Sequence, residues 1–211
     1  MTLTESQATY AAAVDRLWAA DGAHDLGHLA RVWANCQRIA EAEPGADLAV
    51  LLAAAYFHDV VNLPKTSADR SLASVKSADL AVTVLPGLGF DDAKLPAVHH
   101  AIAAHSFSAG IPPQTLDARI LQDADRLEAL GAIGIARMFH VGGAMGGAMF
   151  DADDPLAQRR PLDDRRYALD HLEVKLFPVA AAMQTAAGRQ MAEERAEWMS
   201  SFRTRLLAEL G

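Results

Sequence analysis

The sequence predicts an all-α protein, and two observations support that fold class. Hydrophobic residues make up 51% of the 211 positions, and alanine and leucine dominate over the β-branched and aromatic types that favour strands. Apolar residues also recur at the spacing of one helix face, as at Leu29, Val32, Cys36 and Ile39. The length suits one domain with a sizeable core, so we expect a single domain over residues 1–211.

The first half of the chain predicts five helices, each bounded by start or stop signals. Thr4 precedes the first helix, and the turn "DGAHD" ends it. Asp47 can cap the third helix, which carries His58 and Asp59 near its C-terminal end, before Asn62 and Pro64 break it. The fourth is rich in alanine and stops at "PGLG". The expected ranges are about 6–20, 26–43, 48–61, 68–85 and 91–106.

The second half predicts a longer helix, an irregular segment and two C-terminal helices. Pro113 and Thr115 are start signals for a sixth helix, which we expect to continue towards Phe139. Residues 142–165 are rich in glycine, aspartate and proline, and a loop of that length is usually functional or disordered. Both a flap over the site and a plain connection fit it. Helices near 166–186 and 188–210 make up a segment, 166–211, that we expect to pack on the core.

Charge and cysteine content exclude several classes of partner. The net charge is −8 and no basic cluster stands out, which argues against binding of duplex nucleic acid. The single cysteine, Cys36, lies on an apolar stripe and reads as a buried, inert thiol. The N-terminus lacks the features of a secretory signal, and the apolar run 48–61 is too short to span a bilayer. We expect a cytoplasmic protein without a membrane partner; no pattern indicates its oligomeric state.

A set of polar residues in apolar helical sequence indicates a metal site. His28 lies near the start of the second predicted helix, and His58-Asp59 ends the apolar run "LAVLLAAAYF". A carboxylate carried into such surroundings is costly unless it is paired or bound to a metal. Asp123 and Asp125 flank the apolar stripe of "RILQDADRLEAL" on opposite sides, and periodicity does not choose between them. Without a metal, the histidines would be core or surface residues and the aspartates would pair with nearby arginines.

These residues resemble a known family. The order "H…HD…D", formed by His28, His58-Asp59 and Asp125 in "ADRL", is similar to the HD-domain superfamily of metal-dependent phosphohydrolases. The likeness extends through "HDLGHLARV", "AAAYFHDV", "IAAHSFS" and "QDADRLEALGAIGIAR", and it is closest to the small stand-alone bacterial HD hydrolases. It implies a helical bundle around one metal held by His28, His58, Asp59 and Asp125.

Other residues are candidates for substrate binding and proton transfer. His105 lies on an apolar face and reads as a catalytic acid, a phosphate-binding group or a core histidine. We assign proton transfer to His105 or Asp123, alongside Asp59, and phosphate binding to Lys65 and Arg126. His24 either lines the same pocket or stands in a turn.

The expected function is hydrolysis of a small phosphorylated metabolite, for which a nucleotide is the leading candidate. A divalent ion with positions left for water lowers the pKa of that water towards ~7. Mixed nitrogen and oxygen ligands favour Mn²⁺, with Ni²⁺, Co²⁺ or Fe²⁺ as alternatives, and we expect one ion per chain. His99, His100 and His105 keep a di-iron oxygenase of the same fold open. The third alternative is a non-catalytic nucleotide-binding module with a structural metal.

Overall fold

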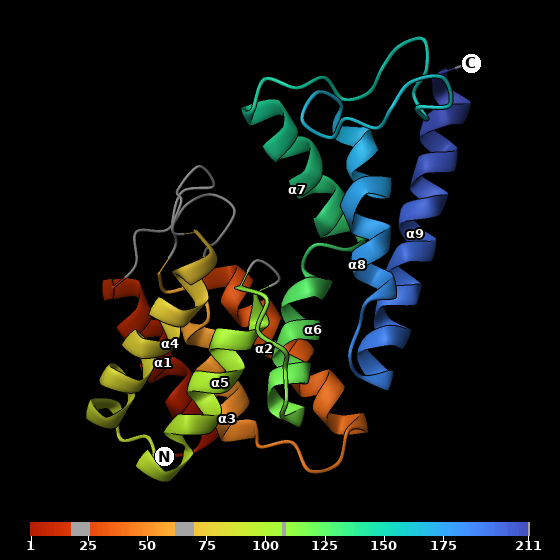
Figure 1. The fold of residues 1–211 in the computed structure, drawn as a ribbon. Helices are drawn as coiled ribbons and strands as arrows, with labels where there is room; N and C mark the ends of the chain where they lie inside the picture. The colour runs from red at the N-terminus through yellow and green to blue at the C-terminus, as the bar shows by residue number, and fades with distance from the viewer. Residues whose placement is uncertain (18–25, 62–69, 107–108, 211) are drawn as a thin grey trace. The chain divides into compact units, whose positions relative to one another are not determined.

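The structure, a computed structural model, is built from helices and describes residues 1–17, 26–61, 70–106 and 109–210 (Figure 1). Its contacts divide the chain into two compact units, Met1–Asp125 and Arg126–Gly211. Within the described residues there is no strand, only an isolated bridge between Ala148 and Tyr167, so the all-α prediction is confirmed. None of the described helices is both long and apolar enough to cross a membrane. That residues 1–211 form one domain stays a prediction.

The first unit holds six α-helices in its described part. Their bounds follow the predicted ranges closely, although short 3₁₀ turns replace parts of the fourth and fifth predicted helices. The α-helices are α1 (Leu3–Leu17), α2 (Leu26–Ala42), α3 (Leu48–Phe57), α4 (Ala73–Val84), α5 (Leu95–His105) and α6 (Leu116–Leu127). The 3₁₀ turns are η1 (Arg70–Leu72), η2 (Leu85–Leu88) and η3 (Asp92–Lys94).

Helix α3 is the centre of this unit. It contacts α1, α2, α4 and α5, and every side chain from Val50 to Phe57 is buried. This follows from the sequence, because the helix has no polar face and can only be stable when it is covered on most sides. His58 and Asp59 come directly after α3. The helix therefore places His58 in the interior of the unit and Asp59 at its edge.

The start of α3 is fixed by Asp47, as the sequence predicts. The Asp47 carboxylate accepts hydrogen bonds from the backbone N–H groups of Ala49 and Val50, at 3.0 and 3.3 Å. Its second oxygen lies 2.6 Å from Lys94 Nζ in η3, and its own backbone N–H donates to Asp117 of α6. This N-cap thus ties α3 to two further elements of the unit.

The second unit contains α7 (Gly131–Ala144), α8 (Phe177–Ala181) and α9 (Ala186–Leu210), with α9 in contact with both α7 and α8. The prediction of one helix from Thr115 towards Phe139 is wrong, because the chain breaks between α6 and α7. Helix α6 ends at Leu127, Leu130 is extended, and Gly131, the first residue of α7, has a φ of 73°, a left-handed conformation that favours glycine and interrupts a continuous α-helix.

The helix predicted near 166–186 is present only in part, as an irregular helical run that is shorter than expected. The chain there forms a 3₁₀ turn, η5 (Ala168–Asp170), a π-helix, η6 (Leu172–Leu176), and the short α8. Pro178 has no N–H to donate, and its ring would clash with the carbonyl four residues earlier in a regular α-helix. The wider π turn directly before it accommodates this residue.

The irregular segment expected at 142–165 begins after α7 and is held by a partly buried ion pair. Both terminal nitrogens of Arg160 donate to the carboxylate of Asp170, at 2.6 and 2.9 Å, and Asp170 is 2% exposed. The Arg160 guanidinium also lies over the ring of Tyr167, 4.2 Å from its centroid. The segment lacks helix or strand periodicity, yet it is ordered by these specific contacts.

Candidate metal centre

The four predicted ligands lie together in the first unit. His28 is in the first turn of α2, His58 caps the C-terminal end of α3, Asp59 follows it, and Asp125 is in the last turn of α6. Asp125 Oδ1 lies 3.5 Å from His28 Nε2 and 3.7 Å from His58 Nε2. Asp59 Oδ2 lies 3.6 Å from His58 Nε2. Helices far apart in the sequence therefore place two imidazoles and two carboxylates around His58.

The cluster is buried on its imidazole side and open on its carboxylate side. His28 and His58 are 1% and 0% exposed, whereas the side chains of Asp59 and Asp125 are 28% and 29% exposed. The two carboxylates are thus partly exposed to solvent, while the imidazoles are held in the helical core.

The ring of His58 is oriented by its own helix. Its Nδ1 lies 2.9 Å from the carbonyl oxygen of Ala55, which only accepts, so Nδ1 carries the proton and Nε2 faces the carboxylates. Nε2 is buried and has no hydrogen-bond partner within the described part of the chain. Burial lowers the pKa of His58, but Asp59 and Asp125 outweigh it and raise the pKa to about 9. Burial raises the pKa of Asp125, and His58 more than offsets this, so the net shift is downward.

These four residues fit a divalent metal ion. Two donor atoms that each lie about 2.1 Å from one ion are about 3.0–3.4 Å apart. The three separations given above, of 3.5–3.7 Å, exceed this by a few tenths of an ångström. The donor atoms of His28, His58 and Asp125 lie within 4.8 Å of one another, and Asp59 falls in a second such group that shares His58. A buried imidazole nitrogen without a hydrogen bond, facing two carboxylates, is what a cation between them would satisfy.

His105 joins this cluster from α5. Its Nε2 lies 3.5 Å from Asp59 Oδ1, and its ring packs edge-on against that of His58, with the centroids 4.9 Å apart. His58, Asp59 and His105 thus form a second group of potential ligands that shares His58 with the group of His28, His58 and Asp125.

The remaining predicted site residues have different surroundings. Asp123 is fully buried and belongs to neither group of potential ligands found in the described residues. Arg126 begins the second unit, where its Nη1 donates to the carbonyl of Ala182 at 2.7 Å. His24 and Lys65 lie outside the described residues.

The other two histidines of α5 are not brought to the cluster. His99 Nε2 is 3.0 Å from Asp79 Oδ1, and the His99 side chain is 38% exposed. His100 Nε2 accepts a hydrogen bond from the backbone N–H of Gln114. The clustered histidines that suggested a di-iron centre therefore contribute only His105 to the site.

Sequence reasoning missed three polar residues that hold the surrounding helices in place. Ser74 Oγ donates to the carbonyl of Ala103, Gln122 Nε2 donates to that of Ala104, and Asn35 Nδ2 donates to that of Ala124. All three side chains are buried. The signal available in the sequence was a polar residue at an apolar position of a helix, which is too common to indicate a role.

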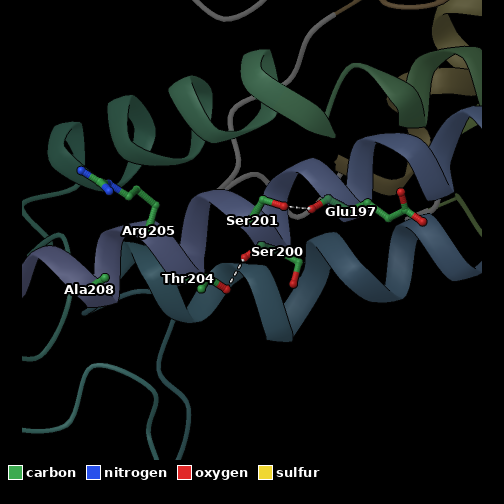
Figure 2. A pocket seen from close by; sticks show the side chains of 6 residues that line it. All are labelled: Glu197, Ser200, Ser201, Thr204, Arg205 and Ala208. Carbon is green, nitrogen blue, oxygen red and sulfur yellow. Dashed lines mark hydrogen bonds between the residues drawn. The ribbon is translucent and has the colours of Figure 1, made fainter.

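A separate surface pocket lies in the second unit and shows no such chemistry (Figure 2). It is lined by Glu197, Ser200, Ser201, Thr204, Arg205 and Ala208, all from α9. The hydroxyls of Ser201 and Thr204 donate to carbonyls of their own helix, those of Glu197 and Ser200. These residues bring no facing element and no group of potential ligands to the pocket.

Comparison with known proteins agrees with the arrangement of the first unit. The model of the HD domain family matches residues 14–130. The chain is 32% identical over 183 residues to the uncharacterized protein YpgQ of Bacillus subtilis, covering 85% of this chain and 80% of that protein. The crystal structure of YpgQ in complex with ADP covers 99% of this chain and 97% of its own, with 29% identity and a TM-score of 0.74. An HD-superfamily hydrolase from Bacillus thuringiensis is 31% identical, with coverage of 99% and 98% and a TM-score of 0.74.

Proposed function

Because the chain belongs to the HD domain family, we propose that it is a metal-dependent phosphohydrolase acting on a small phosphorylated metabolite, with nucleotides as the leading substrate class. The observation that carries this proposal is the buried Nε2 of His58, which faces two carboxylates without a hydrogen-bond partner in the described residues. Solved relatives named as HD-superfamily hydrolases support the reaction class, and the ADP in the YpgQ crystal structure supports the nucleotide.

In this proposal His28, His58, Asp59 and Asp125 hold one divalent ion. The mixed nitrogen and oxygen donors favour Mn²⁺, with Ni²⁺, Co²⁺ or Fe²⁺ as alternatives. When bound, such an ion supplies acidity to water and positive charge to a phosphoryl group. Asp59 and Asp125, which are partly exposed, form the side of the site that meets substrate. The buried imidazoles fix the position of the ion.

The remaining roles rest on residues around this set. His105 or Asp123 assists proton transfer, and Lys65 with Arg126 binds phosphate, with His24 lining the pocket. His105 is the better placed of the two proton-transfer candidates, because its Nε2 lies 3.5 Å from Asp59 whereas Asp123 is fully buried. We expect the protein to act in the cytoplasm.

The test is a hydrolysis screen on protein whose metal content has been measured. Nucleotides and sugar phosphates are incubated with Mn²⁺-loaded protein, and both phosphate and pyrophosphate are assayed. We expect turnover on a nucleotide. Fully loaded protein with no turnover on any compound would instead favour the non-catalytic nucleotide-binding module.

We expect Asp59→Ala to lose both bound metal and turnover, because it removes a carboxylate that faces His58 and His105. Metal content by elemental analysis and initial rates on the best substrate check this. Asp79→Ala is the matched control, since that aspartate is 66% exposed and pairs with the surface residue His99. Wild-type metal content and rate in Asp59→Ala would refute the ligand assignment.

A further inference from the structure

The backbone beyond Asp59 is held by a serine of α4. Helix α3 ends at Phe57, so the chain leaves regular structure just where it carries His58 and Asp59. Ser77 Oγ accepts a hydrogen bond from the backbone N–H of Val61 at 3.0 Å and donates to the carbonyl oxygen of the same residue at 3.5 Å. One hydroxyl therefore engages both backbone polar groups of a residue that lies two positions after Asp59.

Asp59 is consequently followed by two backbone anchors. The next residue is tied to α3, because the N–H of Val60 donates to the carbonyl oxygen of Phe57 at 3.3 Å. The residue after that, Val61, is tied to α4 through Ser77. Packing covers the Asp59 side chain only in part, since it is 28% exposed. An aspartate has one methylene group between its carboxylate and the backbone, so a shift of the backbone moves the carboxylate almost as far.

Ser77 is itself fixed in place. Its side chain is fully buried, where a hydroxyl is costly unless it is hydrogen-bonded, and the bonds to Val61 satisfy it. Its helix is fixed in turn, because Ser74, one turn earlier in α4, donates to the carbonyl of Ala103 in α5. Helix α4 packs against both α3 and α5, yet none of the four proposed ligands comes from it.

The Asp59 carboxylate must be placed accurately to take part in the site. Its Oδ2 lies 3.6 Å from His58 Nε2, and its Oδ1 lies 3.5 Å from His105 Nε2. A functional group set of this kind has to be held within about 0.5 Å of its working geometry, and the residues behind the ligands supply much of that accuracy. The anchor at Val61 is such a support.

We propose that Ser77 is a positioning residue for the metal centre, which holds the backbone at Val61 and thereby keeps the Asp59 carboxylate where it binds the ion. This inference rests on the proposed metal site and adds to it a residue that touches neither metal nor substrate. The competing interpretation is that Ser77 only satisfies the backbone groups of Val61, in which case it matters for folding and not for the metal.

The test compares Ser77→Ala with Ser6→Ala. Both remove the hydroxyl of a buried serine in the first unit, but Ser6 lies in α1, which carries none of the proposed ligands. Co²⁺ affinity is measured by chelator competition, and the visible absorption of bound Co²⁺ reports its coordination. We expect Ser77→Ala to weaken Co²⁺ binding about tenfold and to shift the absorption bands, as the loss of a group that orients a ligand does. Ser6→Ala should alter neither.

Wild-type affinity and an unchanged Co²⁺ spectrum in Ser77→Ala would overturn the positioning role, whatever the melting temperature of the variant. Equal losses of affinity in the two serine variants would also overturn it, because the effect would then follow from a weakened core. Circular dichroism of the metal-free variants checks that they fold. Should Ser77→Ala not fold, Ser77→Cys replaces it, since a thiol fills the space and hydrogen-bonds only weakly. Binding about threefold weaker is then expected, and wild-type affinity would contradict the role.

These outcomes are distinct from failure of the proposed function. Wild-type protein that binds Co²⁺ tightly but hydrolyses no phosphate compound refutes the phosphohydrolase, and the two serine variants still decide the role of Ser77. Wild-type protein that binds no divalent ion refutes both.

Discussion

The His58 imidazole sits between two carboxylates and is fully buried, so its protonation is tied to metal binding. Its pKa of about 9 in metal-free protein means that the ring carries a second proton, on Nε2, at neutral pH. An ion that binds Nε2 must displace this proton. Metal binding and proton release are therefore coupled at this residue.

Metal affinity should consequently rise with pH. Between pH 7 and 8, which lies below the raised pKa of His58, each unit of pH should strengthen binding about tenfold through this one group. Titration calorimetry in two buffers with different ionisation enthalpies should show about one proton released per ion at pH 7.5. A dissociation constant that does not change across this interval would contradict the coupling.

Individual residues also show where sequence reasoning reaches its limit at the site. His28, His58 and Asp59 were predictable because polar groups in apolar helices need a partner. Asp123 and Asp125 flank the same stripe, so periodicity alone does not choose between them; the family resemblance favours Asp125, and the packing of α6 places Asp125 beside His28 and His58. The orientation of His105 depends on its bond to Ile102 and on how α5 meets α3, neither of which the pattern contains.

At the scale of elements, Asp47 connects the start of α3 to η3 and α6. The sequence predicted this cap because aspartate is a preferred N-cap residue before an apolar helix. The positions of Lys94 and Asp117 around it follow from tertiary packing and were not predictable. The cap matters for the site because α3 is the helix that delivers His58 and Asp59.

Asp47→Ala should destabilise the protein by about 1 kcal/mol, as the loss of an N-cap typically does. For a chain of this size that is a fall of about 2–4 °C in melting temperature. Asp91→Ala is the control, because Asp91 caps only the short η3. Equal melting temperatures for Asp47→Ala and the control would show that the cap contributes nothing beyond a surface contact.

Whole elements were predicted best where apolar periodicity is strong and worst where one residue overrides it. The bounds of α2 and α9 lie close to the expected ranges of 26–43 and 188–210. Gly131 continues the apolar stripe of α6 in the sequence, but α6 ends at Leu127 and the left-handed Gly131 begins α7 in a new direction of the backbone. Pro178 similarly converts an amphipathic segment into a π turn and a short α-helix.

At the scale of the molecule, the two units have separate chemistry. The four proposed metal ligands and His105 belong to Met1–Asp125, whereas the ion pair of Arg160 and Asp170 belongs to Arg126–Gly211. That ion pair orders a segment of the second unit that has no regular secondary structure.

Arg160→Met should destabilise the protein by about 1–3 kcal/mol, because the buried carboxylate of Asp170 loses its arginine partner and keeps the hydrogen bond from the backbone N–H of Asp163. The dissociation constant for metal should stay at the wild-type value. Arg205→Met is the control, since Arg205 is 79% exposed and its pair with Glu209 is worth only a few tenths of a kcal/mol. Urea denaturation and chelator competition measure the two effects, and a matching loss of metal affinity would show that the units are coupled.

The single cysteine can report how often the helices of the first unit open. Cys36 is fully buried in α2, and burial, followed by the charges of Asp125 and Asp117, raises the pKa of its thiol. A thiol reagent should therefore modify it only during transient opening of the helices around it. The rate of Cys36 labelling, followed by mass spectrometry, would measure the rate of that opening without an introduced probe.

Metal at about a hundred times its dissociation constant should slow labelling about a hundredfold, if binding and opening are mutually exclusive. An equal rate with and without metal would mean that Cys36 is uncovered by a motion that leaves the histidines and aspartates in place.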